Sequence, residues 1–356
     1  MSWESNIRRV VPYTPGEQPK LDNITKLNTN ENPYPPSPGV QEILNGFDVS
    51  RMRLYPDPNA QVLVDALAKT YGVGREQIFV GVGSDDVISM AFMTFFNGNK
   101  PILFPDVTYS FYDVWAEVYR IPYEQIPLTD DFRIDPKDYV RPNGGIIFPN
   151  PNAPTGVFES LGTIEAIVKA NPESIVIVDE AYIDFGGTSA LSLLERYENL
   201  LIVQTFSKSR SMAGMRIGFA IGSEKLIRYM NDVKFSVNSY TMNHLTLLCG
   251  AEALADDAYF REITSKIVET REQAKKRLTE LGFVFPDSYS NFIFAKHKCA
   301  DAGEIFRKLK DRCIFVRYWN KPRISQYLRI TVGTPEEMER LYAALADILS
   351  EMGATA

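Results

Sequence analysis

The chain has 356 residues, 45% of them hydrophobic and 23% charged, a balance typical of a globular protein with two domains. Its formal net charge of −7 argues against a surface for nucleic acid or for anionic membranes. No apolar run approaches the ~20 residues of a membrane-spanning helix, and the first residues lack the pattern of a secretory signal.

Cysteines and histidines are few and scattered. Cys249, Cys299 and Cys313 are odd in number, widely spaced and outside any metal-ligand pattern. We expect them to be reduced, which favours a cytoplasmic protein without a metal site. The two histidines, His244 and His297, argue against histidine-based catalysis, and His244 lies in an apolar helical pattern that favours packing.

Residues 1–38 are rich in proline and asparagine and show little periodicity. They predict an irregular N-terminal arm. Two interpretations stay open: an arm that only crosses the surface, or an arm that closes over a site or a neighbouring subunit.

A helix is expected over residues 61–71, where apolar residues recur at helical spacing. A short strand over residues 78–82 follows, then a Gly-Ser turn and a helix over residues 87–96. A Gly-Ser turn that opens a helix offers free backbone N–H groups to a phosphate. Ser84 and Asp85 are also ordinary helix-capping residues, so capping alone stays an alternative.

The next two expected strands, residues 101–104 and 145–148, run into loops of distinct composition. The first is followed by an aromatic cluster at residues 108–112, where Tyr109 can stack on a flat ring. The second is followed by residues 150–156, Asn-Pro-Asn-Ala-Pro-Thr-Gly, which are too rich in turn formers for regular structure. The asparagines of this loop are short polar donors.

A β-branched strand expected over residues 174–178 ends in Asp179-Glu180-Ala181-Tyr182. A carboxylate at the end of a buried run is costly unless a cation pairs with it. A protonated pyridine nitrogen would be such a cation.

An apolar strand over residues 200–203 leads into residues 205–218, Thr-Phe-Ser-Lys-Ser-Arg-Ser-Met-Ala-Gly-Met-Arg-Ile-Gly. The amine of Lys208 can condense with an aldehyde to form a Schiff base. The hydroxyls and Arg216 suit a phosphate dianion, because arginine makes forked, charge-assisted hydrogen bonds. An aldehyde and a phosphate on one small molecule describe pyridoxal phosphate. On this stretch alone, an ordinary surface lysine and arginine remain an alternative.

Strands that alternate with helical patterns, up to a strand over residues 218–221, indicate an α/β domain with a mostly parallel sheet. Ligands of such sheets bind beyond the carboxyl ends of the strands. Each candidate group lies next to the end of an expected strand, which favours one shared cofactor site over unrelated surface residues.

The C-terminal part predicts a smaller α/β domain, reached through a helix over residues 239–254 and a long charged helix over residues 257–281. Its other expected elements are strands over residues 283–285, 291–294, 314–317 and 328–334 and helices over residues 302–309 and 335–349. Arg317 and Arg329 lie in otherwise apolar strands, where a solvated edge or recognition of an anion would explain them. We therefore predict an arm of residues 1–38, a large cofactor-binding domain of residues 39–265 and a small domain of residues 266–356.

Together these motifs resemble the fold-type-I pyridoxal-phosphate enzymes over almost the whole chain, and within them the histidinol-phosphate aminotransferases. Residues 205–208 with 213–216 are similar to the cofactor-lysine motif, residues 179–182 to the pyridine-binding strand end, and residues 152–156 to the asparagine loop. The narrower resemblance rests on residues 27–34, 55–57 and 328–337. It implies a mostly parallel, seven-stranded sheet, a smaller C-terminal α/β domain, and amino transfer between L-glutamate and histidinol phosphate in histidine biosynthesis.

The resemblance also implies how pyridoxal phosphate is held. Lys208 would form the Schiff base and carry the proton, Asp179 would pair with the pyridine nitrogen, and Tyr109 would stack on the ring. Tyr182 and Asn152 would bind the phenolic oxygen. The phosphate would be held by the backbone of Ser84 and Asp85 and by Thr205, Ser207 and Arg216.

Substrate binding and assembly follow from the same resemblance. The anionic end of the substrate would be held by Arg329, Arg317, Tyr13 and Asn30. The protein would be a homodimer in which Tyr55 and the N-terminal arm reach the neighbouring site.

One position departs from the family pattern, because many relatives have asparagine where this chain has Ala153. We expect Asn152 to reach the phenolic oxygen, since Ala153 has no donor. Three other functions stay open: an aromatic or broad-specificity amino-acid aminotransferase, a decarboxylase of phosphorylated amino acids, and a transcriptional regulator with an aminotransferase-like domain. The irregular arm and the acidic charge disfavour the regulator.

Overall fold

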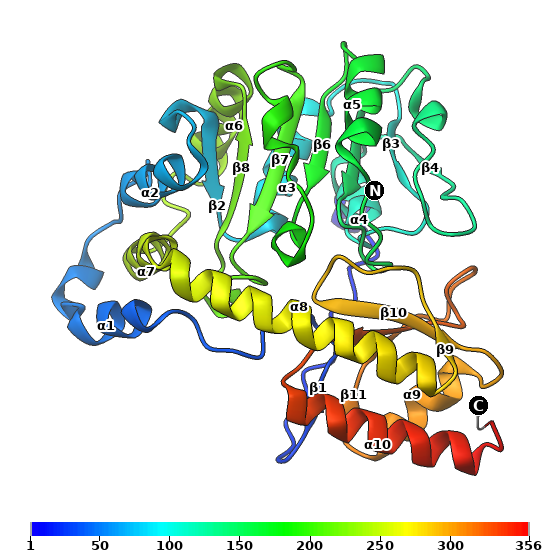
Figure 1. Ribbon diagram of the computed structural model, residues 1–356. Coiled ribbons are helices and arrows are strands. Elements are labelled where there is room, and N and C mark those ends of the chain that lie inside the picture. Colours follow the sequence, from blue (N-terminus) through cyan, green and yellow to red (C-terminus); the bar gives the residue numbers. More distant parts are fainter. Residues whose placement is uncertain (1, 355–356) are drawn as a thin grey trace.

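A sheet of seven strands runs through the larger part of the chain (Figure 1). This computed structural model describes residues 2–354, and the outermost residues of the predicted arm and small domain, 1 and 355–356, lie outside the described residues. In spatial order the strands are β2 (Ile78–Gly81), β8 (Gly218–Gly222), β7 (Leu200–Thr205), β6 (Val176–Asp179), β5 (Gly145–Pro149), β3 (Ile102–Pro105) and β4 (Tyr123–Ile126). Within this sheet only β8 opposes the others, because it is antiparallel to both β2 and β7. The predicted mostly parallel sheet of seven strands is confirmed.

Helices cover both faces of this sheet. β5, β6 and β7 are buried along their whole length, as expected for apolar strands between two helical layers. One face is covered by α3 (Ser84–Phe95), α4 (Tyr112–Tyr119) and α6 (Glu224–Val237), the other by α5 (Leu161–Ala170), α2 (Gln61–Tyr71) and α7 (His244–Ala255), with α1 (Pro38–Gly46) beside α7. Short 3-10 turns are η1 (Trp3–Asn6), η2 (Val49–Arg53), η3 (Arg75–Gln77), η4 (Pro136–Tyr139), η5 (Ile183–Phe185), η6 (Ala190–Leu193) and η7 (Ala213–Met215).

Some element boundaries differ from the prediction for local reasons. α3 begins at Ser84 instead of residue 87, because Gly83 ends the preceding turn with φ at +84°. α7 begins at His244 instead of residue 239, where the Asn243 side chain caps the helix by accepting from the Thr246 backbone N–H. The prediction missed α1, α4, α5, α6 and β4; β4 is an edge strand with two exposed polar residues at its centre, so it has no apolar run.

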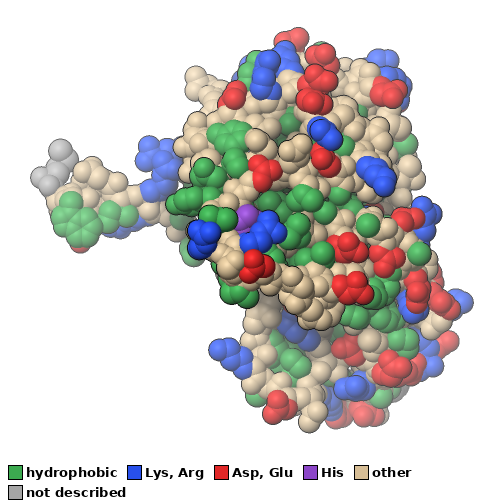
Figure 2. All heavy atoms as spheres, turned by 90° about the vertical axis from the view of Figure 1, so that its left-hand side faces the viewer, with side chains coloured by type: hydrophobic (Ala, Val, Ile, Leu, Met, Phe, Trp, Pro, Cys, Tyr) green, Lys and Arg blue, Asp and Glu red, His purple; other side chains and the backbone are tan. Residues whose placement is uncertain are grey.

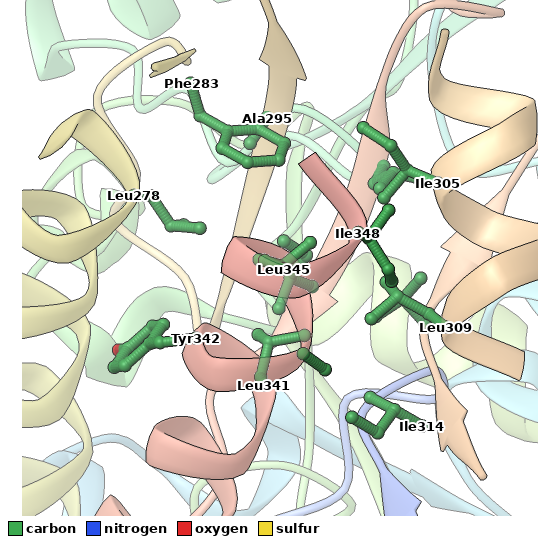
Figure 3. Close-up of a cluster of buried hydrophobic side chains, with 14 of the residues drawn as sticks. Leu278, Phe283, Ala295, Ile305, Leu309, Ile314, Leu341, Tyr342, Leu345 and Ile348 are labelled. Carbon is green, nitrogen blue, oxygen red and sulfur yellow. The ribbon is translucent and has the colours of Figure 1, made fainter. Parts of the chain in front are cut away.

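A second, antiparallel sheet lies in the C-terminal part, in the order β12 (Arg317–Tyr318), β13 (Leu328–Thr331), β10 (Phe292–His297) and β9 (Phe283–Val284). It packs against α9 (Ala302–Asp311), α10 (Pro335–Glu351) and α8 (Asp257–Glu280). Figure 3 shows Phe283, Ile305 and Leu345 meeting in the core between these elements. The strand predicted over residues 314–317 is two strands, since β11 (Ile314–Phe315) and β12 belong to different sheets.

The N-terminal segment is tied to this smaller unit. β1 (Thr25–Lys26) pairs in parallel with β11, and Leu27 is buried in the same core. α8 runs unbroken along both units (Figure 1). The predicted domain boundaries after residues 38 and 265 stay predictions.

Two further features of residues 2–354 concern membranes and metal ions. Within that range no helix combines the length and apolarity needed to cross a membrane. Across the same residues, no three His, Cys, Asp or Glu side chains gather in a way that would hold a metal ion.

Candidate active site

The candidate groups meet at the edge of the large sheet where the parallel strands end. Asp179, the last residue of β6, pairs with the last residue of β5. Gly218, the first residue of β8, pairs with Thr205 at the end of β7 and with Gly81 at the end of β2. Because β8 runs opposite to its neighbours, its beginning lies beside their ends. This direction brings Arg216, two residues before β8, to the same edge.

Lys208 follows β7 and is half-buried at this edge. Its Nζ atom donates to the carbonyl oxygen of Thr29 at 3.1 Å and lies 5.9 Å from the centre of the Tyr182 ring. Burial and then the positive charge of Arg329 lower the pKa of Lys208 to about 8, against the opposing charge of Glu31. Near pH 7 about a tenth of this amine is therefore uncharged, the form that attacks carbonyl groups and accepts protons.

Asp179 lies at the base of the site with only 5% of its surface exposed. Its carboxylate accepts hydrogen bonds from Tyr112 Oη at 3.0 Å and from the Ala181 backbone N–H at 3.2 Å. Burial nevertheless raises the pKa of Asp179 to about 6, because two hydrogen bonds do not replace its lost hydration. A positively charged ring nitrogen against this carboxylate would offset the cost of burying it.

An anion cradle lies on the other side of Lys208. Ser84 and Asp85 open α3, so their backbone N–H groups lie at a positive helix end. Thr205 Oγ1 lies 3.0 Å from Ser207 Oγ, and both residues line the same cavity as Lys208. The guanidinium of Arg216 completes the cradle, with Nη2 3.3 Å from Asp85 Oδ2. These donors suit a phosphate dianion.

Tyr109 and Tyr182 line the cavity between the cradle and Asp179. Tyr109 Oη donates to Asp85 Oδ1 at 2.8 Å, which fixes its ring at the site. Tyr182 Oη accepts a hydrogen bond from Asn30 Nδ2 at 2.9 Å. Burial raises the pKa of both phenols, so each remains a neutral donor at physiological pH.

The asparagine loop presents Ala153 to the cavity, and the predicted contact of Asn152 with the cofactor stays a prediction. Ala153 lines the cavity, whereas Asn152 is absent from the lining. The Asn152 amide nitrogen already donates to the Val107 carbonyl at 3.0 Å and to Thr155 Oγ1 at 2.8 Å. The proposed bond from Asn152 to the cofactor's phenolic oxygen would require this amide to change partners, which leaves Tyr182 as the phenolic donor in the cavity.

A cationic end of the cavity is formed by Arg329, Arg317 and Tyr13. Arg329 Nη2 donates to the Asn28 carbonyl at 3.0 Å, while its buried Nε has no partner among the described residues. Arg317 donates to the carbonyls of Thr14 and Pro15 at 3.0 and 3.3 Å. Burial raises the pKa of the Tyr13 phenol, and the two arginines oppose that rise. An anionic ligand group at this end would pair with the free donor of Arg329.

Asn30 links the site to the smaller unit, because its side chain donates to Tyr182 and its backbone bonds to residues of that unit. Its backbone N–H donates to Thr331 Oγ1 at 3.0 Å, and its carbonyl accepts from Asn291 Nδ2 at 3.0 Å. Asn30 adopts φ +57°, a left-handed conformation that asparagine tolerates better than most residues. It lines the cavity, and its amide nitrogen is used by Tyr182.

Tyr55 lies outside the cavity of its own chain. It is 80% exposed on the outer face, where its ring stacks on Tyr240 with 4.6 Å between centroids. Tyr13 of the arm lines the cavity of its own chain, and the predicted reach of the arm to a neighbouring site stays a prediction.

Three side chains that support the site had no role predicted from the sequence. Tyr112, which holds Asp179, was noticed only as part of an aromatic cluster. Asn32 lay in the motif of residues 27–34 without an assigned role; its amide nitrogen donates to the Lys208 carbonyl at 3.0 Å. Thr331 had no local signal, because its partner Asn30 is 301 positions away.

The cavity has a volume of about 200 Å³ and joins Lys208, the cradle, Asp179 and the cationic end in one site. Its residues fit pyridoxal phosphate: an amine for the aldehyde, a cradle for the phosphate, a buried carboxylate for the ring nitrogen and a phenol for the ring oxygen. Lining residues from the predicted site are Tyr13, Asn30, Ser84, Asp85, Tyr109, Asp179, Tyr182, Thr205, Ser207, Lys208, Arg216, Arg317 and Arg329. The fold and the site thus define a lysine-centred, pyridoxal-phosphate type of active site.

Comparison with known proteins gives the family. Residues 22–345 match the aminotransferase class I and II family. The chain is 51% identical over 350 residues to histidinol-phosphate aminotransferase 2 of Dechloromonas aromatica, covering 97% of this chain and 98% of the relative. It is 52% identical over 352 residues to histidinol-phosphate aminotransferase 1 of Hydrogenovibrio crunogenus, covering 99% of each. The chain belongs to the class I and II aminotransferases and, within them, to the histidinol-phosphate aminotransferases, as its motifs predicted.

A solved structure confirms the fold class. The histidinol-phosphate aminotransferase of Sinorhizobium meliloti, in complex with pyridoxal-5'-phosphate, superposes with a TM-score of 0.85 over 92% of this chain and 91% of that chain. Only 23% of residues are identical, so this likeness concerns the fold alone. The predicted fold-type-I architecture is confirmed.

Proposed function

We propose that the protein is a pyridoxal-phosphate-dependent transaminase of histidine biosynthesis. It exchanges an amino group between two pairs of compounds. One pair is L-glutamate and 2-oxoglutarate, and the other is histidinol phosphate and imidazole acetol phosphate. The observation that carries the proposal is one cavity that joins Lys208, the phosphate cradle, Asp179 and the unpartnered guanidinium nitrogen of Arg329. The relatives' names supply the substrate class. A cytoplasmic location stays a prediction from the cysteine pattern.

Bound pyridoxal phosphate supplies a carbonyl that takes up amino groups and a ring that withdraws electrons. Lys208 would carry the proton from the α-carbon of the amino donor to the cofactor carbon that takes up the amino group, since its lowered pKa of about 8 suits both accepting and donating a proton near neutral pH. Asp179 holds a proton on the ring nitrogen opposite it, because an ionised carboxylate favours the charged form of a neighbouring base. Thr205, Ser207 and Arg216 anchor the phosphate and orient the ring.

The cationic end of the cavity would hold the substrate's anionic group. The forked guanidinium groups of Arg329 and Arg317 match both carboxylate and phosphate, so one site can accept glutamate and histidinol phosphate in turn. Tyr13 adds a neutral hydroxyl donor between them. This arrangement supports the choice of substrates, while the roles of the individual residues are proposals.

The proposed function is tested with purified, cofactor-loaded protein and 2-oxoglutarate. We expect kcat/KM for L-histidinol phosphate to exceed that for L-phenylalanine by about a hundredfold, since burial of an imidazole and a phosphate adds charge-assisted hydrogen bonds. Glutamate formation and carbon dioxide release are measured together. A preference for phenylalanine would indicate an aromatic aminotransferase, and carbon dioxide from O-phospho-L-threonine would indicate a decarboxylase.

Assembly is a second part of the proposal: the active unit is a homodimer in which Tyr55 reaches the cofactor phosphate of the partner. Exposed apolar side chains lie on or beside α1, η2 and α7, at Leu44, Val49, Met52, Leu54, Tyr55 and Tyr240. Figure 2 views this side and shows apolar side chains gathered across it. A cavity of about 270 Å³ beside Arg216, lined also by Leu44 and Met215, offers a path to the cradle. A two-fold dimer would bury this face in both chains.

Replacing Tyr55 with phenylalanine tests this contact. We expect the variant to stay dimeric and to bind pyridoxal phosphate about tenfold more weakly, because one hydrogen bond to a charged phosphate is lost. Light scattering gives the mass, and titration of the cofactor-free protein gives the dissociation constant. A monomeric wild-type protein, or an unchanged dissociation constant, would contradict the proposal.

A further inference from the structure

Residues 27–32 form a strip that is held in place above Lys208. Asn28 Nδ2 donates to the Glu17 carbonyl at 2.8 Å, Asn30 Nδ2 to Tyr182 Oη at 2.9 Å, and Asn32 Nδ2 to the Lys208 carbonyl at 3.0 Å. The strip directly follows β1, which pairs with β11. These bonds fix its backbone, so side chains carried between the asparagines have defined positions at the cavity.

Glu31 is one of these side chains and lines the cavity with Lys208 and Arg329. Its Oε2 atom pairs with Lys26 Nζ and accepts from Thr29 Oγ1 at 2.8 Å. Among the described residues its Oε1 atom receives no hydrogen bond, and 44% of the side chain is exposed. Burial alone would raise the pKa of Glu31, but the bonds from Lys26 and Thr29 and the charges of Lys26 and Lys208 lower it. The carboxylate is thus ionised and has a free acceptor.

The other carboxylates that line the cavity are committed elsewhere. Asp179 lies buried at the base, where Tyr112 and the Ala181 N–H hold it. Asp85 accepts from Tyr109 and pairs with Arg216 at the cradle. Of these three lining carboxylates, only Glu31 has a half-exposed side chain with an oxygen that no described residue contacts.

The cavity therefore carries opposite charges in different places. Arg329 is held against the Asn28 carbonyl and lies over the rings of Phe292 and Trp319, while Glu31 is held by Lys26 and Thr29. Histidinol phosphate also has two different ends. A phosphate lies on one side of its amine, and an imidazole lies on the other. The imidazole is an N–H donor with an ordinary pKa near 6.5. Glutamate has a carboxylate on both sides.

We infer that Glu31 is a specificity-determining residue whose carboxylate accepts a hydrogen bond from the imidazole ring of histidinol phosphate. This inference rests on the proposed function and adds the group that recognises the imidazole. Arginines at one end attract the anionic group of either substrate, whereas the carboxylate of Glu31 attracts an imidazole and repels the side-chain carboxylate of glutamate. A single fixed site thereby distinguishes its two amino donors at the imidazole end.

The test replaces Glu31 with glutamine, which keeps the shape and removes the charge. We expect kcat/KM for L-histidinol phosphate to fall about ten- to a hundredfold, mainly through a higher KM, because a hydrogen bond to a charged acceptor is weakened. For L-glutamate, kcat/KM should stay within about twofold or rise, because a repulsive charge is removed. Each half-reaction is followed separately by single-turnover absorbance of the holoenzyme.

Two control variants separate this role from a purely structural one. Glu17→Gln removes another glutamate of the N-terminal segment, which pairs with Lys310. This variant should leave kcat/KM unchanged for both substrates. Arg329→Gln should raise KM for both substrates. Equal losses for both substrates in Glu31→Gln, or no loss for histidinol phosphate, would overturn the inference. A wild-type protein that does not react with histidinol phosphate would instead overturn the proposed function.

Discussion

Replacing Lys208 with alanine is expected to lower kcat for transamination by about 10⁴-fold or more, because one substitution removes both the nucleophile and the proton carrier. No other lysine takes its place. Lys26, which directly precedes the strip of residues 27–32, is engaged by Glu31 and Thr29. Turnover of histidinol phosphate with 2-oxoglutarate is the primary measurement.

A second measurement reports on Lys208 without turnover. Borohydride reduction of the cofactor-loaded wild-type protein should leave the cofactor covalently attached to the peptide that contains Lys208, and the alanine variant should retain none. Lys225→Ala, which alters an exposed lysine on α6, is the control and should behave as the wild type. A Lys208→Ala protein with wild-type turnover, or a covalent cofactor on another lysine, would refute the central role of this residue.

Replacing Asp179 with asparagine is expected to separate activity from stability. In the cofactor-loaded protein kcat should fall about 10³-fold, because a neutral amide does not keep the ring nitrogen protonated. A loss of this size is typical when a preorganised charge is removed from an active site. In the cofactor-free protein the same change should raise the free energy of unfolding by about 2 kcal/mol at pH 8. Asparagine can still accept from the Ala181 N–H and donate to Tyr112 Oη, the two present partners.

The pH dependence of this stabilisation has a definite sign. The folded-state pKa of Asp179 is raised from 3.8 to about 6, so the ionised carboxylate destabilises the cofactor-free protein above pH 6. As the pH falls from 6 towards 4, the folded protein takes up a proton that the unfolded chain does not, and the wild type recovers the difference. The increase in the free energy of unfolding caused by Asp179→Asn should therefore be largest at pH 7 to 8 and vanish near pH 4.

Denaturant unfolding of both cofactor-free proteins at pH 4, 6 and 8 measures the difference. Glu180, whose pKa burial raises to about 7, is present in both proteins, so its titration cancels in the comparison. A variant that is no more stable than the wild type at pH 8 would show that the ionised Asp179 carboxylate does not destabilise the cofactor-free protein. Wild-type activity in the variant would remove the role of Asp179 at the ring nitrogen.

Local sequence determined the fold class and the core of the site. Runs of Val, Ile and Leu predict buried strands, and in a parallel sheet the residue after each strand must lie at one edge. Asp179, Lys208, Ser84 and Tyr109 could therefore be grouped without coordinates. β4, an edge strand with polar residues, has no such signal and was missed.

The tertiary structure decided which distant groups meet. Arg216 reaches the cradle because β8 runs against its neighbours, a direction that its residues do not encode locally. Asn30 and Thr331 lie 301 positions apart and meet only because β1 joins the C-terminal unit. Whether the Asn152 amide is free for a ligand also depended on the fold, which engages it with the Val107 carbonyl and Thr155 Oγ1.

For this protein, then, the sequence alone determined the cofactor lysine, its carboxylate partner and the reaction class, because each follows from a short motif at the end of a strand. Tyr13, Arg317 and Arg329 were expected at the substrate only through the family resemblance, and the tertiary structure places them with Glu31 around one cavity. These residues come from the arm and from the C-terminal unit, and their convergence depends on β1, which joins the arm to the C-terminal unit, and on α8, which contacts both units. Their meeting depends on chain packing because they lie far apart in the sequence, so residue chemistry at each position does not by itself bring them together.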